Sequence, residues 1–174
     1  MKTFFLSILL LSLSHLLFAQ YALPKGKVQA NVGVGLSSWG LPLYLGLDVG
    51  VHKDISIGGE ISYRTYNEKW KDRNNQYNFR RTILGISGNA NYHLNSALDI
   101  SKDWDLYLGI NIGFYSWSDP VRGNYVYDGR YNSGLGVGGQ VGGRYYFSKK
   151  AAINLELGGG NAFAGGKLGI TIKL

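Results

Sequence analysis

The sequence contains no cysteine, and this absence removes several kinds of structure and chemistry at once. No disulfide can hold the fold together, no thiolate can bind a metal ion, and no cysteine can act as a nucleophile. A lipid anchor on an amino-terminal cysteine is excluded for the same reason. An exported protein of this sequence must therefore be stabilised without covalent cross-links.

Long apolar runs are also lacking. The longest, at residues 4–18, falls short of the roughly 20 residues that a helix needs to span a bilayer. It follows Lys2 and precedes Ala19, which is the arrangement of a secretory signal peptide with a small residue at its cleavage site. We therefore expect residues 1–19 to be a cleaved signal peptide and residues 20–174 to form one mature domain. A single membrane anchor is the alternative, and the run is short for it.

Glycine and tyrosine are abundant, with 26 and 13 residues, and the formal net charge is +7. Glycine disfavours helices, and tyrosine is enriched in strands. A positive net charge can indicate nucleic-acid binding, but in an exported protein it fits contact with an anionic membrane surface better. We expect no nucleic-acid partner.

Apolar residues alternate with glycine or polar residues through most of the chain, and this period of two predicts β-strands. Around residue 46, for example, Leu45 and Leu47 lie on one face, and Gly46 and Asp48 on the other. No helix is predicted after the signal. Eight strands of about 8 to 13 residues are expected by this pattern, and they begin near residues 28, 43, 55, 84, 104, 135, 153 and 168.

The predicted connections alternate in length along the chain. Those at residues 53–54 and 148–150 are tight, and the one at 95–103 is of moderate length. The connections at residues 65–80 and 116–131 are long, polar and rich in aromatic residues. An even number of strands with short turns at one end and long loops at the other is typical of an up-and-down barrel in an outer membrane.

The polar face of the strands carries most of the glycines, which decides which face points inward. Glycine weakens a strand unless space is needed, and space is scarce inside an eight-stranded barrel. Aromatic residues also lie near both ends of the strands, for example Trp104 and Tyr145 beside the short turns and Tyr63 and Trp117 beside the long loops. Such belts are favoured at lipid interfaces. The apolar face is therefore predicted to contact lipid; the alternative is a soluble, lipocalin-like binding barrel with the apolar face inward.

These features, with the final strand KLGITIKL, resemble the small outer-membrane β-barrel proteins of Gram-negative bacteria, the OmpA/OmpX-like eight-stranded group. The letters FAQ at the end of the signal resemble those of Bacteroidetes secretory proteins. The resemblance covers residues 27–174 and departs from the family at Leu174, where an aromatic residue is usual. It implies an all-β, eight-stranded antiparallel up-and-down transmembrane β-barrel in the outer membrane. It also implies contact with outer-membrane lipid and lipopolysaccharide, a barrel-assembly machinery as partner during biogenesis, and a monomer.

Chemistry-bearing motifs are few. GLGVGG at residues 134–139 matches a dinucleotide fingerprint but lies within a predicted strand, so it is interpreted as space-making. His52 and His93 fall beside short turns, and no histidine lies in the long loops to act as a base there. We expect no catalytic residue, cofactor or metal site, and hence a non-enzymatic protein with a structural, adhesive or narrow-pore role. A lipid A-modifying outer-membrane enzyme is the alternative.

Two groups of residues are candidates for function. Charges on the inward face must be paired or hydrated, so we expect an ionic network that closes the lumen, with Arg144 bridging to Glu156 and reaching an acidic pair; a water-filled pore is the alternative. The basic loop at 65–81 is predicted to contact lipopolysaccharide phosphates, unless it is only solvated. The network is assigned to Asp48, Glu60, Arg144 and Glu156, and the loop contacts to Lys69, Trp70, Lys71, Arg73, Arg80 and Arg81.

Overall fold

The computed structural model describes residues 23–38, 40–72, 75–118, 121–122, 125–126, 132–161 and 164–174. For residues 68–72 and 75–79 and for the segments 121–122 and 125–126, only the backbone is described. The predicted signal peptide at residues 1–19 lies outside the described residues.

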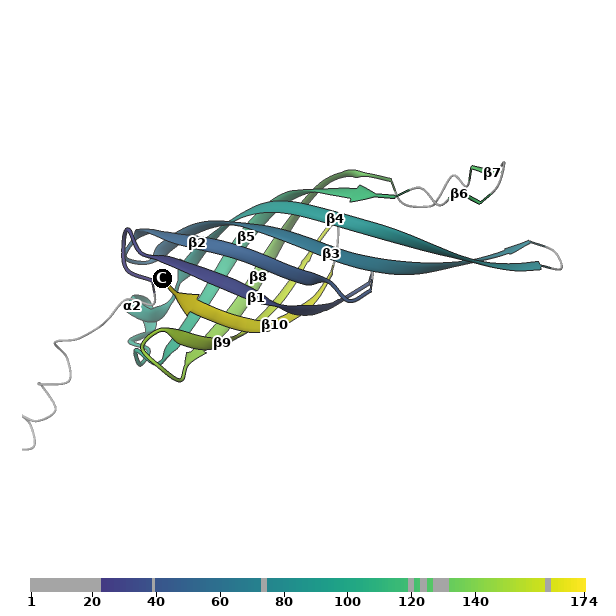
Figure 1. The fold of residues 1–174 in the computed structure, drawn as a ribbon. Coiled ribbons are helices and arrows are strands. Elements are labelled where there is room, and N and C mark those ends of the chain that lie inside the picture. The colour runs from purple at the N-terminus through teal and green to yellow at the C-terminus, as the bar shows by residue number, and fades with distance from the viewer. Residues whose placement is uncertain are drawn as a thin grey trace, which may run out of the picture.

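Eight antiparallel strands form one closed barrel, in the order β1-β10-β9-β8-β5-β4-β3-β2. Each strand pairs with its neighbours along the chain, and β1 pairs with β10 to close the circle, as an up-and-down topology requires. The prediction of an all-β, eight-stranded antiparallel barrel is confirmed (Figure 1). Its strands are β1 (Val28–Ser37), β2 (Leu43–His52), β3 (Ile55–Asp72), β4 (Asn75–His93), β5 (Trp104–Trp117), β8 (Gly134–Tyr146), β9 (Ala151–Gly160) and β10 (Ala164–Lys173).

The two ends of the barrel differ. At one end, which we call the tight-turn end, lie the connections at residues 53–54, 94–103 and 147–150 and the carboxyl terminus. From the other end, the long-hairpin end, β3 and β4 extend well beyond the remaining strands (Figure 1). A separate two-stranded sheet, β6 (Val121–Arg122) with β7 (Tyr125–Val126), lies in the connection between β5 and β8.

Two details differ from the sequence prediction. Residues 65–80 were expected to be a loop, but β3 and β4 stay paired from Ile55↔Tyr92 to Asp72↔Asn75. The segment carries four aromatic residues, Tyr66, Trp70, Tyr77 and Phe79, and aromatic residues are enriched in strands, so pairing continues past the barrel rim. The connection at 95–103 contains a short helix, α2 (Asn95–Leu98), although no helix was expected. Among the described residues, no helix is long and apolar enough to cross a membrane.

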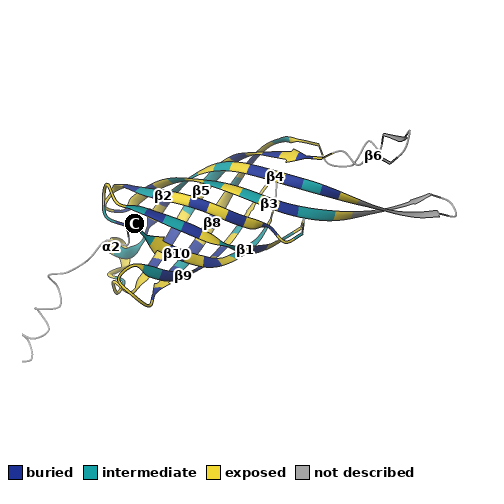
Figure 2. Cartoon of the chain, viewed as in Figure 1, coloured by how far each residue is buried: buried dark blue, intermediate teal, exposed yellow. Residues whose placement is uncertain are grey.

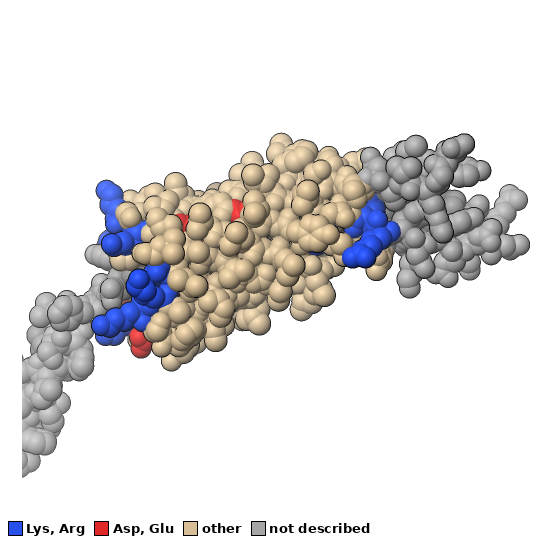
Figure 3. Space-filling model, viewed as in Figure 1, with Lys and Arg blue, Asp and Glu red and all other residues tan. Residues whose placement is uncertain are grey.

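The outer face of the barrel is apolar along its middle. Side chains such as Ile86 and Ile110 are 64% and 68% exposed, and they alternate with buried residues along each strand (Figure 2). On the face shown in Figure 3, Lys and Arg gather near the two ends and leave the middle free of them. An apolar outer band with a polar interior is the pattern of a membrane-spanning barrel and the reverse of that of a soluble one.

Inward-facing glycines make room for the interior side chains, as predicted. A Cβ on Gly142 would lie against the ring of Tyr107, and one on Gly58 would lie against the carboxylate of Asp48. The large polar side chains of the lumen therefore depend on glycine at the facing positions of neighbouring strands.

Candidate functional site in the barrel interior

A buried ion-pair cluster lies at the centre of the tight-turn half of the lumen. Arg144, on β8, donates from Nη1 to Asp105 Oδ2 on β5 at 2.8 Å, and from Nη2 to Asp48 Oδ2 on β2 at 3.2 Å. All three side chains are at most 4% exposed. The guanidinium also lies over the ring of Tyr107, with Cζ 4.2 Å from the ring centroid. One arginine therefore joins opposite walls of the barrel.

Amide side chains complete the coordination of Asp48. Its carboxylate accepts hydrogen bonds from Gln29 Nε2 at 3.0 Å, Asn31 Nδ2 at 2.9 Å and Asn89 Nδ2 at 3.1 Å. Asn89 is on β4 and reaches Asp48 past β3, where the residue opposite Asp48 is Gly58. The buried negative charge is thus balanced by one guanidinium and three donated hydrogen bonds, which a buried charge requires.

A second cluster lies nearer the long-hairpin end. Lys167, on β10, contacts both oxygens of Glu60 at 2.8 and 2.9 Å, and its Nζ lies 3.1 Å from Glu156 Oε1. The other oxygen of Glu156 accepts a hydrogen bond from the hydroxyl of Tyr107 at 2.9 Å. Because Tyr107 also lies under Arg144, it connects the two clusters.

The four predicted network residues all face the interior and form ion pairs, but their partners differ from the predicted ones. Arg144 pairs with Asp48 rather than with Glu156, and Glu156 pairs with Lys167. Asp48 and Glu60 are not an acidic pair at one level, since each belongs to a different cluster. In register Arg144 is opposite Asn154, two residues from Glu156, so the arginine extends across the lumen instead of along its neighbour.

Sequence reasoning missed two charged members of these clusters. Asp105 lies between the outward-facing Trp104 and Leu106 and so faces inward, but it was not assigned to the network. Lys167 precedes the stretch in which the alternation of the last strand is clear, so it was overlooked. The available signal was parity alone, since Lys167 lies one residue before the outward-facing Leu168 and therefore faces inward.

A serine, a histidine and an aspartate form a hydrogen-bonded chain at the tight-turn end. His93 Nδ1 lies 2.7 Å from Asp105 Oδ1, and His93 Nε2 lies 2.9 Å from Ser56 Oγ. In the neutral imidazole whose Nδ1 proton points at the carboxylate, Nε2 accepts the hydrogen bond of the serine hydroxyl, and these are the contacts of a serine-nucleophile triad. All three residues are fully buried, and none of them borders the interior cavity, so no substrate carbonyl can reach Ser56 in this structure.

The space that remains in the lumen is small. A cavity of about 30 Å³ lies between the two clusters and is bordered by Asp48 and Arg144 on one side and Glu60 and Lys167 on the other. A site needs roughly 10–15 Å³ to hold one water, so this cavity has room for about two. Water, rather than an organic ligand, fits a polar cavity of this size.

Both mouths of the described barrel are filled. At the tight-turn end Leu23 is 1% exposed, and its segment is held by the Gly26 amide, which donates to the Gly50 carbonyl at 2.7 Å. At the long-hairpin end, Trp117 packs with Ile83 inside the barrel, and the Arg81 Cζ lies 5.0 Å from the Trp117 ring centroid. The polar interior is thus covered from both sides.

For most of the residues predicted to contact lipopolysaccharide, the structure describes no side chain. Lys69, Trp70 and Lys71 have only their backbone described, and Arg73 lies outside the described residues. Arg80 is exposed, whereas Arg81 is fully buried and donates from Nε to the carbonyl of Ser118, just beyond the end of β5, at 3.0 Å. The side chain of Arg81 therefore faces away from lipid, in contrast to the prediction.

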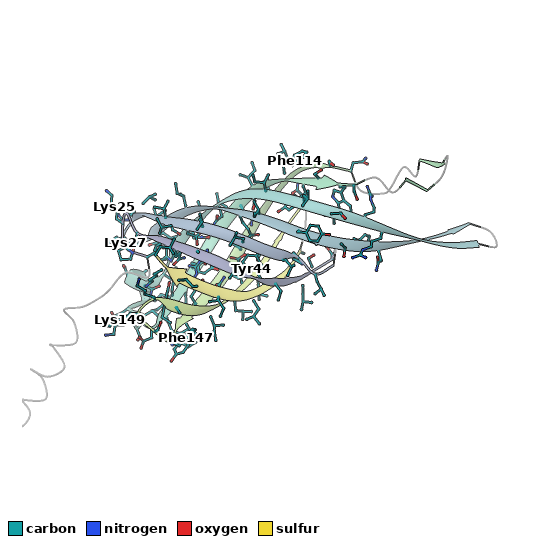
Figure 4. All side chains as sticks on the ribbon, in the orientation of Figure 1. Lys25, Lys27, Tyr44, Phe114, Phe147 and Lys149 are labelled. Atoms are coloured by element: carbon teal, nitrogen blue, oxygen red, sulfur yellow. The ribbon has the colours of Figure 1, made fainter. Side chains whose placement is uncertain are left out.

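Aromatic side chains mark the outer surface near both ends. Trp104 and Tyr145 pack against each other at the tight-turn end, with ring centroids 4.9 Å apart and the rings tilted by 49°, and Phe147 lies at the same end (Figure 4). At the long-hairpin end Tyr63 and Phe114 are exposed on the outside. Trp117 was expected in this outer belt but faces the interior. It lies three residues after the outward-facing Phe114, and side chains an odd number of residues apart on a strand point to opposite faces.

No family model and no curated protein matches the sequence. Among solved structures, OprG from Pseudomonas aeruginosa aligns with a TM-score of 0.68 at 9% identity, over 87% of this chain and 97% of that chain. The N-terminal β-barrel domain of Pseudomonas aeruginosa OprF has a TM-score of 0.55 at 12% identity, over 86% and 98%. Neisserial surface protein A has 0.53 at 14%, over 85% and 95%. At these identities the similarity shows a shared fold, that of the small eight-stranded outer-membrane barrels.

Proposed function

We propose that the protein is a non-enzymatic barrel of a Gram-negative outer membrane, with a closed lumen and a working surface at the long-hairpin end. The apolar outer band and the similarity of the fold to outer-membrane barrels support this location. The observation that carries the closed lumen is the pair of ion-pair clusters, which spans the interior and leaves a cavity of about 30 Å³. In this proposal the chain is exported by the signal at residues 1–19, inserted as a monomer by the barrel-assembly machinery, and needs no cofactor.

A closed lumen predicts little or no steady ion current. Purified protein reconstituted in a planar bilayer is expected to give no stable open level, because an ion would have to break the contacts of Arg144 or Lys167 to pass. An established porin reconstituted in the same way is the positive control. A large, stable, ohmic conductance from the wild type would show a true pore and contradict the proposal.

The orientation follows from the lengths of the connections. Turns on the periplasmic side of such barrels are short, so the long-hairpin end should face the outside of the cell. Epitope tags inserted at Asn74 and at Asn124 are expected to bind antibody on intact cells. A tag in the turn at residues 53–54 is the matched control and should bind only after the outer membrane is permeabilised. The reverse pattern of labelling would reverse the topology.

The hairpin formed by β3 and β4 is the proposed contact with the cell exterior. Its basic residues, of which Arg80 is exposed on the described surface, suit the phosphates of lipopolysaccharide. Adhesion to another surface would use the same segment. A lipid A-modifying enzyme fits less well, because the Ser56–His93–Asp105 chain is buried at the opposite end.

A further inference from the structure

An arc of lysine side chains at the tight-turn end is not used by the proposed function. Lys and Arg gather at this end in Figure 3, and Figure 4 places Lys25, Lys27 and Lys149 there. The arc runs from the β8–β9 connection, past the β10–β1 pair, to the β2–β3 turn. Its exposed members are Lys25, Lys27, Lys53, Lys149 and Lys150.

Backbone contacts show that these lysines, which are distant in sequence, form one continuous surface. The amide of Lys173, the last residue of β10, donates to the carbonyl of Lys150 at 2.7 Å. On the other side of the β10–β1 pair, the Gly50 amide donates to the carbonyl of Lys27 at 2.9 Å, and Lys25 forms a bridge with Gly50. Two connections of the barrel and the segment before β1 thus bring their lysines to the same part of the rim.

The arc has few acidic side chains to neutralise it. Among the described residues of the arc, the acidic side chain is Asp54, which lies 3.7 Å from Lys53 and also accepts a hydrogen bond from the hydroxyl of Ser96. The exposed aspartates of this end, Asp99 and Asp103, lie in the connection between β4 and β5, outside the arc. The positive charge is therefore concentrated on one side of the rim.

The depth of the arc follows from the aromatic side chains next to it. Tyr145 and Phe147 are exposed on the outer surface, where aromatic rings occupy the membrane interface. Lys149 is two residues beyond Phe147, in the turn that follows the end of β8 at Tyr146. The headgroup region adds roughly 5–7 Å to each side of the hydrocarbon core. The lysine ammonium groups consequently lie at the depth of the lipid phosphates.

We propose that this lysine arc is a docking surface for anionic phospholipid headgroups in the leaflet at the tight-turn end. Lysine is suited to this contact, because its flexible stem can follow the apolar surface while its ammonium group meets a phosphate as a point charge. The proposal concerns the outer rim of the barrel and is independent of whether the lumen conducts.

The test compares lipid enrichment around the protein in nanodiscs made from phosphatidylethanolamine and phosphatidylglycerol. We expect phosphatidylglycerol to be enriched around the wild type, and the enrichment to fall as salt is raised. In the double variant Lys27→Gln/Lys149→Gln, the enrichment of phosphatidylglycerol should fall by about fivefold for each lysine removed. This factor corresponds to the usual contribution of one basic residue near an anionic surface. Lys102→Gln removes an exposed lysine of the same end outside the arc and should leave the enrichment unchanged.

Three outcomes would overturn the proposal. The wild type could show no preference for phosphatidylglycerol at any salt concentration, or Lys102→Gln could reduce the preference as much as the double variant does. The double variant could also keep the lipid preference and lose binding to acidic peptidoglycan fragments, which would identify a different partner. Because all three lysines are exposed, the variants should fold, and the salt dependence of the wild type is informative without any variant.

Discussion

The substitution Arg144→Ala is expected to lower the free energy of unfolding by about 3–5 kcal/mol, the usual cost of removing one partner from a buried ion pair. The reason is that Asp48 and Asp105 both lose their guanidinium while they remain buried in the lumen. Water entering the vacated space would reduce the loss toward the lower value. Urea titration of the folded protein in detergent micelles or lipid vesicles, followed by tryptophan fluorescence, measures the effect.

Two further variants distinguish the effect of losing the ion pairs from the effect of losing an arginine in general. Arg80→Ala removes an exposed arginine of β4 and should change the unfolding free energy by less than about 0.5 kcal/mol. Arg144→Lys keeps the charge but has no planar fork with which to reach two carboxylates, so its stability should lie between those of the wild type and Arg144→Ala. Equal stabilities for Arg144→Ala and the wild type would remove this residue from the network that closes the lumen.

The architecture could be predicted from sequence because it rests on a local pattern. Side chains alternate between two faces of a strand, so the outward position of Leu45 and Leu47 and the inward position of Asp48 follow from parity. Glycine at inward positions, as at Gly58, then indicated that the polar face fills a narrow interior, and the structure shows an apolar outer band around a polar lumen.

The ionic partners could not be predicted, because they depend on how the strands are shifted relative to one another. Asp105 is opposite Arg144 in the β5–β8 register, whereas Asp48 is four strands away along the barrel circumference. Arg144 reaches it only because the lumen is narrow and tilted strands bring distant residues to one level. The alternation of apolar and polar residues along each strand contains no information on the stagger or the tilt of the strands. The same limit applies to the length of the β3–β4 ribbon, which is fixed by pairing between the two strands.

The second large effect is expected at a glycine. Gly142, on β8, faces the interior, where a Cβ would fall against the ring of Tyr107. That ring cannot move aside easily, because Tyr107 is fully buried and its hydroxyl contacts both Asn154 at 3.0 Å and Glu156 at 2.9 Å. Gly142→Ala should therefore destabilise the barrel by about 1–3 kcal/mol, the usual cost of overpacking. The measurement is the same urea titration, combined with the heat-dependent mobility of the folded barrel in electrophoresis.

Gly139 is the matched control for this prediction, since it lies on the same strand and faces outward. A Cβ there would have its nearest neighbour at 3.9 Å, an ordinary contact distance. Glycine in a strand interior is less stable than alanine by roughly 0.5–1 kcal/mol, so Gly139→Ala should leave the unfolding free energy unchanged or raise it slightly. The two substitutions add the same methyl group three residues apart, and Gly142→Ala alone should lower the free energy of unfolding if the interior is filled. Equal tolerance of both would mean that the lumen has free space at Tyr107, and the closed interior would no longer account for the inward glycines.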